Sequence, residues 1–120
     1  MQTILIIEDN DVNIKLAETI LSDAGYNVVS TTRAEETFAL MDAHSPDLVL
    51  MDVHLPGMDG VTALQLLRSD PKRRATKVIA VTAMALPGDR DMLIGIGFDD
   101  YLSKPYKLNA LLTTVRGALG

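Results

Sequence analysis

Residues 47–52, Asp-Leu-Val-Leu-Met-Asp, place four consecutive apolar side chains directly before a carboxylate. A run of this length suits a buried strand and is too short for a helix. A second run, Thr3–Ile7, stops in the same way at Glu8 and Asp9. Unbroken apolar strands are typical of parallel sheets that are covered on both faces. The two stretches therefore predict a parallel sheet whose strands end in acidic residues.

The rest of the chain repeats this alternation of strand and helix. Three further strand-like runs are Asn27–Thr31, Lys77–Val81 with an end near Thr82, and Asp99–Ser103. Apolar residues at helical spacing predict five helices between them, marked by Ile14, Ala17, Leu21 and Ala24; by Ala34, Phe38 and Met41; by Val61, Leu64 and Leu67; over Leu86–Ile96; and by Leu108, Leu111, Leu112, Val115 and Leu119. Right-handed crossovers between such strands predict a doubly wound three-layer α/β sandwich.

Local signals refine the expected ends of these helices. Thr32 and Glu35 have the spacing of a capping box, which predicts the start of the second helix. Gly88 and Gly95 fall in the fourth predicted helix and would weaken it by roughly 1 kcal/mol each in its interior. Lys107 stands where a capping Ser or Asp would suit the last helix.

Composition restricts the function classes. The 120 residues suit one domain, 1–120, and we expect no output domain. The net charge of −5 and the absence of Trp argue against direct nucleic-acid binding. Without cysteine, signal sequence or membrane span, we expect a cytoplasmic protein, and a monomer is the simplest state.

The polar residues that follow the strands suggest a shared site. Ligands of such sheets bind beyond the carboxyl ends of the strands. Glu8 and Asp9, Asp52, Thr82 and Lys104 follow four different strands and would converge there.

Three carboxylates in one pocket repel one another unless a positive group offsets them. A hard divalent cation with oxygen ligands meets this need, and we expect Mg²⁺, with Mn²⁺ as an alternative ion. Lys104 adds a second cation and Thr82 a hydroxyl donor. A carboxylate in these surroundings suits phosphoryl transfer, with Asp52 as the nucleophile and an acyl phosphate as the product.

Four motifs resemble the receiver domains of two-component response regulators over essentially the whole chain. They are Ile7-Glu8-Asp9-Asn10, residues 50–60 (LMDVHLPGMDG), Val81-Thr82-Ala83 and Tyr101-Leu102-Ser103-Lys104-Pro105. The stretches 8–13 and 83–88 look most like single-domain regulators of the DivK type, and receivers of hybrid histidine kinases are similar there. The resemblance implies a flavodoxin-like (βα)5 fold with strand order 2-1-3-4-5.

The resemblance also implies a role for each site residue. Asp52 would accept a phosphoryl group from a histidine kinase or a histidine phosphotransfer protein. Asp9 and Asp52 would bind magnesium directly, together with the backbone carbonyl of His54, and Glu8 would act through water. Thr82 and Lys104 would bind phosphoryl oxygens.

Further implications concern the switch. Tyr101 would turn inward as Thr82 moves, and the fourth helix, fifth strand and last helix (the α4-β5-α5 surface) would bind a downstream protein. The Lys104–Pro105 peptide would be cis. The protein would act only on its own phosphorylation and dephosphorylation, and cell-cycle or developmental signalling is the corresponding process.

Two residues depart from common patterns of the family. His54 stands where many relatives carry Asn or a small residue. Met84 is apolar at a position that influences hydrolysis, and we predict slow self-dephosphorylation from it.

Three other functions compete with this interpretation. A phosphatase of the haloacid dehalogenase type also places a nucleophilic Asp after a strand, but it needs a second acid where His54 stands. A flavin-binding electron carrier shares the fold, but Glu8 and Asp9 would repel the flavin phosphate. A receiver-like docking module without phosphorylation would not need the complete set of acids, Thr and Lys.

Overall fold

The computed structural model describes residues 1–54, 58–83 and 88–120 of the chain. The elements are β1 (Thr3–Ile7), α1 (Asp11–Asp23), β2 (Asn27–Thr31), a 3-10 helix η1 (Ala34–Glu36), α2 (Thr37–His44), β3 (Leu48–Asp52), α3 (Gly60–Ser69), β4 (Lys77–Thr82), α4 (Asp89–Ile96), β5 (Asp100–Ser103) and α5 (Leu108–Leu119). Among these residues, no helix is both long and apolar enough to cross a lipid bilayer.

The strands form one five-stranded sheet in the order β2-β1-β3-β4-β5, and every neighbouring pair is parallel. The predicted strand order and fold class are therefore confirmed. The chain starts at β1, continues outward to the edge strand β2, and then returns past β1 to the central strand β3. This reversal places the switch point of the strand order between β1 and β3, where a ligand is expected.

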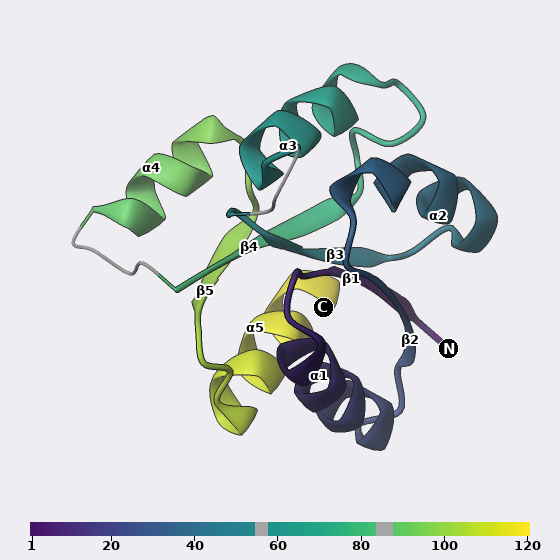
Figure 1. The fold of residues 1–120 in the computed structure, drawn as a ribbon, viewed down its shortest axis with the longest axis vertical. Helices are drawn as coiled ribbons and strands as arrows, with labels where there is room; N and C mark the ends of the chain where they lie inside the picture. Colours follow the sequence, from purple (N-terminus) through teal and green to yellow (C-terminus); the bar gives the residue numbers. More distant parts are fainter. Residues whose placement is uncertain (55–57, 84–87) are drawn as a thin grey trace.

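Helices cover both faces of the sheet, as Figure 1 shows: α1 and α5 lie on one side, and α2, α3 and α4 on the other. Successive strand residues point to opposite faces, so each strand contributes to two cores. One core joins Ile4, Ile6, Leu48, Leu50, Ile79 and Val81 to buried residues of α1 and α5. The other joins Leu5, Ile7, Val49, Met51, Val78 and Ala80 to Ala34 and Met41 and to buried residues of α3 and α4. The two cores fix the sheet rigidly enough to place side chains at its edge.

The capping-box prediction for the second helix is wrong. Arg33 precedes η1 without a side-chain cap, and α2 begins only at Thr37. The Thr37 hydroxyl instead donates to the carbonyl of Ala34 at 2.6 Å. The Thr31 hydroxyl, at the end of β2, donates to the Glu36 carboxylate. Neither η1 nor α2 therefore has the predicted side-chain cap, and a side-chain bond joins the end of β2 to the end of η1.

The fourth helix also begins differently from its prediction. Its described part starts at Asp89, and the predicted start at Leu86 lies outside the described residues. Gly88 is the N-cap with a φ of 89°, so it supplies a left-handed turn and does not weaken the helix interior. Gly95 is inside the helix, as predicted. Lys107 precedes α5 without a side-chain cap, which confirms that prediction.

Candidate functional site

The sheet delivers the predicted polar residues to the carboxyl ends of β1, β3, β4 and β5. Ile7 pairs with Met51, so Glu8 and Asp52 follow at the same level of two neighbouring strands. Thr82 pairs with Ser103, and the Lys104 backbone N–H donates to the Thr82 carbonyl at 2.8 Å. The register of the parallel strands thus brings together residues that are up to 96 positions apart in the chain.

Asp52 is the last residue of β3 and its side chain is buried, with 2% exposure for the residue. Its Oδ2 accepts a hydrogen bond from Lys104 Nζ at 2.7 Å. Its Oδ1 accepts one from the His54 backbone N–H at 2.9 Å. Both oxygens are therefore held in place, and Lys104 lies beside the carboxylate as the sequence predicts.

Glu8, Asp9 and Asp52 form an acidic cluster. One carboxylate oxygen of each residue lies within 4.8 Å of the others. Glu8 is fully buried, Asp52 nearly so, and Asp9 is exposed. Glu8 Oε2 is buried and has no hydrogen-bond partner in the described part of the chain. An orphaned carboxylate oxygen among two further acids fits a hard cation, which is the ligand chemistry that Mg²⁺ favours.

Lys104 ties two of these acids together. Its Nζ lies 2.5 Å from Glu8 Oε1 and 2.7 Å from Asp52 Oδ2, and only 12% of its side chain is exposed. The peptide bond that follows it, Lys104–Pro105, is cis, which confirms the expectation from the resemblance.

Burial and mutual contact shift the pKa values of this cluster. Burial raises the pKa of Glu8, and the charge of Asp52 adds to the shift, while a hydrogen bond from Lys104 opposes it. Burial lowers the pKa of Lys104, but hydrogen bonds to Asp52 and Glu8 outweigh burial and leave that pKa raised. Lys104 is therefore held as a cation next to the two acids.

The start of α3 lies against the backbone of Asp52. Asp59 caps this helix by accepting from the Thr62 backbone N–H at 2.8 Å, and Gly60 is its first residue. A Cβ atom at Gly60 would stand 2.3 Å from the Asp52 carbonyl oxygen. The approach therefore requires glycine. Residues 55–57, which precede this helix, lie outside the described part of the chain.

The remaining predicted residues take different positions. Thr82 is buried at the end of β4, with 3% exposure. Tyr101, in the middle of the sheet's edge strand β5, is half-buried and packs against the core on the α3 and α4 side. His54 is exposed. Met84, which carries the prediction of slow self-dephosphorylation, lies outside the described residues.

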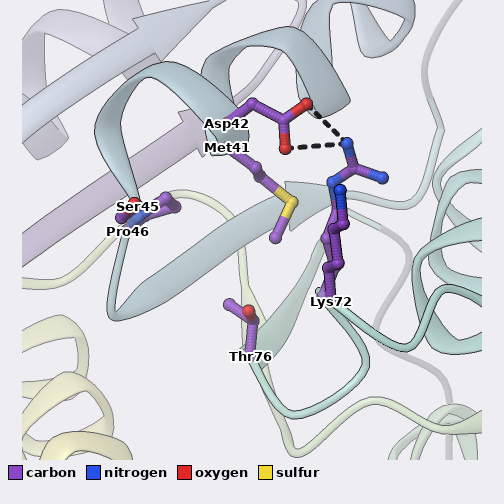
Figure 2. Close-up of a pocket in the computed structure, with 7 residues that line it drawn as sticks. Met41, Asp42, Ser45, Pro46, Lys72 and Thr76 are labelled. Atoms are coloured by element: carbon purple, nitrogen blue, oxygen red, sulfur yellow. Dashed lines mark hydrogen bonds and ion pairs between the residues drawn. The ribbon is translucent and has the colours of Figure 1, made fainter.

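A hollow at the opposite edge of the sheet is a different kind of feature. It has a volume of about 310 Å³ and lies between the end of α2 and the segment from α3 to β4. Figure 2 shows Asp42 there with both carboxylate oxygens bonded to a guanidinium, that of Arg73, at 2.7 and 2.8 Å. Arg73 also pairs with Asp70 and stacks over Phe38, 5.2 Å from the ring centre. The Arg73 guanidinium is thus paired with two acids. Among the described residues, the group that could hold a metal ion is Glu8, Asp9 and Asp52, so the acidic cluster remains the candidate site.

Sequence reasoning missed two residues that border the acidic cluster. Asn13, in the first turn of α1, donates from Nδ2 to Glu8 Oε1 at 3.4 Å. Tyr106, which follows the cis proline, is buried with 7% exposure and lies beside Glu8. The spacing of Asn13 from Glu8 was a usable signal, because a helix that starts after a strand turns its first inward residues toward the strand's end. No comparable signal marks the Tyr106 hydroxyl.

Known proteins resemble this chain in both sequence and structure. The response regulator receiver domain family matches residues 4–116. The polar-differentiation response regulator DivK of Brucella anthropi is 35% identical over 119 residues, which cover 99% of this chain and 97% of that protein. Similar structures include a putative response regulator from Chloroflexus aurantiacus, with 30% identity, a TM-score of 0.91, and coverage of 98% of this chain and 97% of that one.

A further similar structure is the receiver domain of the sensor histidine kinase PA1611 from Pseudomonas aeruginosa. It has 35% identity and a TM-score of 0.88, covers 99% of this chain and 98% of that one, and was solved with a magnesium ion coordinated in its active site cleft. Sequence match, strand order and overall structure agree, and the chain belongs to the family of response regulator receiver domains.

Proposed function

We propose that this protein is a phosphorylated signalling switch that accepts a phosphoryl group on Asp52 from a histidine kinase or a histidine phosphotransfer protein. One observation carries the proposal: the Asp52 carboxylate is buried at a strand end with Lys104 Nζ at 2.7 Å and with oxygens of Glu8 and Asp9 within 4.8 Å. A phosphoryl group with a bound cation suits such a set, because the cation offsets the acids and Lys104 can pair with a phosphoryl oxygen.

Phosphorylation would proceed by in-line transfer. A carboxylate oxygen of Asp52 forms a bond to phosphorus while the bond from phosphorus to the imidazole nitrogen of the donor breaks, and the electron pair of that bond stays on the nitrogen. The imidazole leaves neutral because its other ring nitrogen carries a proton. Lys104 moves from its ion pairs with the acids to a phosphoryl oxygen, and the Thr82 hydroxyl donates to another. Asp9, Asp52 and the His54 carbonyl would hold Mg²⁺, with Glu8 acting through water, and the bound ion would supply positive charge for the phosphoryl oxygens. Mn²⁺ would substitute for it.

The proposed output is a change at the α4-β5-α5 surface. A phosphoryl group adds roughly −1.5 to −2 charges beside Thr82, which selects one of two arrangements of that surface. Tyr101 lies on β5 and packs against the core under α4, so its side chain is placed to follow a movement at Thr82. A downstream protein would bind this surface. DivK-like relatives support a role in cell-cycle or developmental signalling. A cytoplasmic location, a monomeric state and the absence of an output domain stay predictions.

Intact-mass measurement tests the phosphoacceptor proposal. The protein is incubated with Mg²⁺ and phosphoramidate, a small donor with a phosphorus–nitrogen bond. We expect the wild type to gain one phosphoryl group. We expect no gain when Mg²⁺ is chelated before the donor is added, and no gain in Asp52→Asn. Asp59→Asn, which alters an exposed acid at the start of α3, is the matched control and should be phosphorylated. Turnover of unrelated phosphomonoesters would instead favour the phosphatase, and absence of any gain would favour a docking module.

A binding measurement tests the switch. We expect Tyr101→Ala to be phosphorylated to the same extent as the wild type but not to gain affinity for the downstream protein on phosphorylation. Tyr26→Ala, directly before β2, is the control for loss of a half-buried tyrosine. Equal gain of affinity in Tyr101→Ala and the wild type would remove Tyr101 from the mechanism.

A further inference from the structure

The segment between α3 and β4 concentrates positive charge in a chain whose net charge is −5. Five of the chain's 11 Lys and Arg residues lie between positions 68 and 77: Arg68, Lys72, Arg73, Arg74 and Lys77. We call residues 68–77 the basic segment. It leads into the amino end of β4, so it lies at the edge of the sheet opposite the acidic cluster.

The basic segment is held in one conformation from inside. The Arg68 guanidinium donates to the carbonyls of Arg74 and Thr76, at 2.7 and 2.6 Å. Asp70 Oδ1 accepts from the Lys72 backbone N–H at 2.9 Å, and the Asp70 carbonyl accepts from the Arg74 backbone N–H at 2.9 Å. The turn is therefore formed before a partner arrives, which lowers the entropy cost of binding.

The outer cations of the basic segment lack acids of their own. Lys72 and Arg74 are exposed, and neither side chain forms an ion pair or a hydrogen bond with the residues that the structure describes. The Lys77 side chain is 54% exposed and its Nζ lies 4.0 Å from Asp99, whose other oxygen pairs with Arg68. These three cations can therefore pair with acids from outside the molecule.

The hollow beside the basic segment gathers hydrogen-bond donors. Its lining includes Ser45, Lys72 and Thr76, and Figure 2 shows Ser45 and Lys72 on opposite sides of it. Both carboxylate oxygens of Asp42, the acid in the lining, are already bonded to Arg73. The hydroxyls of Ser45 and Thr76 bond to none of the described residues. An ammonium and two hydroxyls around one hollow suit a carboxylate ligand.

We propose that the basic segment and the hollow bind an acidic segment of another protein, with a Glu or Asp side chain in the hollow and neighbouring acids paired with Arg74 and Lys77. A protein segment carries its carboxylates on a narrow chain, which matches a small group of cations. A nucleic acid or an anionic membrane spreads negative charge over a wider area, where the net charge of −5 would oppose binding. The site lies apart from Asp52, so the proposal does not depend on the proposed function.

Fluorescence anisotropy with a labelled hexaglutamate peptide tests the charge requirement. We expect the wild type to bind hexaglutamate, not to bind hexaglutamine, and to bind hexaglutamate more weakly as the salt concentration rises. In Lys72→Gln/Arg74→Gln the dissociation constant should rise about fivefold. Lys15→Gln/Arg116→Gln makes the same change of net charge at exposed positions of α1 and α5, and it should bind like the wild type.

Thr76→Val tests the hollow without a change of charge. It removes one hydroxyl and keeps the shape of the side chain, and we expect about threefold weaker binding of hexaglutamate. Thr113→Val, at an exposed position of α5, should have no effect. In NMR spectra of the wild type, the peptide should shift the amide signals of Ser45 and of residues 70–77 and leave that of Asp52 in place. The charge variants alter only exposed side chains, so they test the proposal even if Thr76→Val does not fold.

Several results would overturn the proposal. They are equal affinity of Lys72→Gln/Arg74→Gln and its control for hexaglutamate, a wild type that binds hexaglutamate no more tightly than hexaglutamine, and amide shifts that fall away from the basic segment.

Phosphatidylserine vesicles and a short duplex DNA are tested in parallel. If either binds the wild type where hexaglutamate does not, and loses binding in Lys72→Gln/Arg74→Gln, the basic segment serves that class of partner and the acidic protein segment is overturned. None of these measurements involves phosphorylation, so the proposed function stands or fails separately.

Discussion

Glu8 is the residue at which stability and function conflict most clearly. Glu8 is fully buried. The pKa of its carboxyl group lies above the ordinary value of 4.5, mainly because of burial. The folded protein therefore retains a proton on Glu8 at pH values where the unfolded chain has released it. Ionised Glu8 costs folding free energy, and this cost appears as the pH rises from about 4.5 toward the raised pKa.

Replacement of Glu8 by Gln should therefore stabilise the metal-free protein at neutral pH. Lys104 Nζ keeps its ion pair with Asp52 Oδ2 at 2.7 Å, so its charge still has a partner in the variant. We expect the free energy of unfolding of Glu8→Gln, relative to the wild type, to increase as the pH rises above 4.5 and then to level off. The gain is about 1.4 kcal/mol for each unit of raised pKa. Urea unfolding at a series of pH values measures it, and a difference that is flat across this range would contradict the explanation.

Gly60 tests how closely the fold holds Asp52. Ala at this position would place a Cβ 2.3 Å from the Asp52 carbonyl oxygen. We expect Gly60→Ala to lose about 1–3 kcal/mol of stability and to displace the phosphoacceptor. Urea unfolding measures the first effect and the rate of phosphorylation by phosphoramidate the second.

Gly117 provides the matched control for Gly60. It lies in α5, where an added Cβ meets no atom within 4 Å. Gly117→Ala should gain up to about 1 kcal/mol, as alanine normally does in a helix. A similar loss in both variants would mean that the tight approach to Asp52 is not the cause.

The sequence predicted the acids, Lys104 and their convergence, because each follows an apolar strand and parallel strands share an edge. It did not predict Asn13 and Tyr106. The spacing of Asn13 from Glu8 is a usable signal, but it is separate from the hydrophobic periodicity on which the prediction relied. The direction in which the Tyr106 side chain turns after β5 is not encoded in that periodicity.

Arg68 is the main connection between elements on the α3 and α4 face. From the last turn of α3 its guanidinium donates to the carbonyls of Thr76 and Gly97, at 2.6 and 3.0 Å, and pairs with Asp99 at 2.7 Å. It also donates to the Arg74 carbonyl at 2.7 Å. One side chain thus joins the turn before β4, the end of α4 and the start of β5.

Replacement of Arg68 by Lys should loosen α4 without changing the charge. A single ammonium cannot reproduce the planar set of donors, so several carbonyls lose their partner. We expect a loss of about 2–4 kcal/mol in stability and faster hydrogen exchange of the amides in α4. Arg116→Lys on the exposed side of α5 should stay within about 0.5 kcal/mol of the wild type. Unchanged exchange in α4 of Arg68→Lys would show that this arginine does not restrain the helix.

The first residues of α2 and α4 were harder to predict than the positions of the strands. The spacing of Thr32 and Glu35 matched a capping box. In the structure η1 begins at Ala34 without a side-chain cap, and the Thr31 hydroxyl bonds to the Glu36 carboxylate. The local sequence shows which side chains could cap a helix. Which contacts form depends on where β2 ends relative to that helix. Strand positions were predicted closely, because burial on both faces leaves little choice of register.

At the level of the whole molecule, the two edges of the sheet have different charge balance. The edge with the amino ends of the strands pairs Arg73 with Asp42 and Asp70. The edge with the carboxyl ends gathers three acids around one lysine. We expect this excess of negative charge to destabilise the metal-free fold and a bound cation to offset it.

Mg²⁺ should therefore raise the free energy of unfolding. The expected gain is about 2.7 kcal/mol at a Mg²⁺ concentration of one hundred times the dissociation constant, and chelation reverses it. Asp9→Asn should lose most of the gain, whereas Asp91→Asn on exposed α4 should keep it. Urea unfolding with and without Mg²⁺ measures the difference, and equal stabilisation of both variants would place the ion elsewhere.

The position of the phosphoryl group is the measurement that bears most directly on the proposed function. After reaction with phosphoramidate and Mg²⁺, borohydride reduction converts an acyl phosphate on aspartate into homoserine, which peptide sequencing by mass spectrometry locates. We predict a single homoserine at position 52 and none in protein treated without Mg²⁺. Homoserine at Asp9 or Asp59, or no homoserine in protein that has gained a phosphoryl group, would contradict Asp52 as the phosphoacceptor.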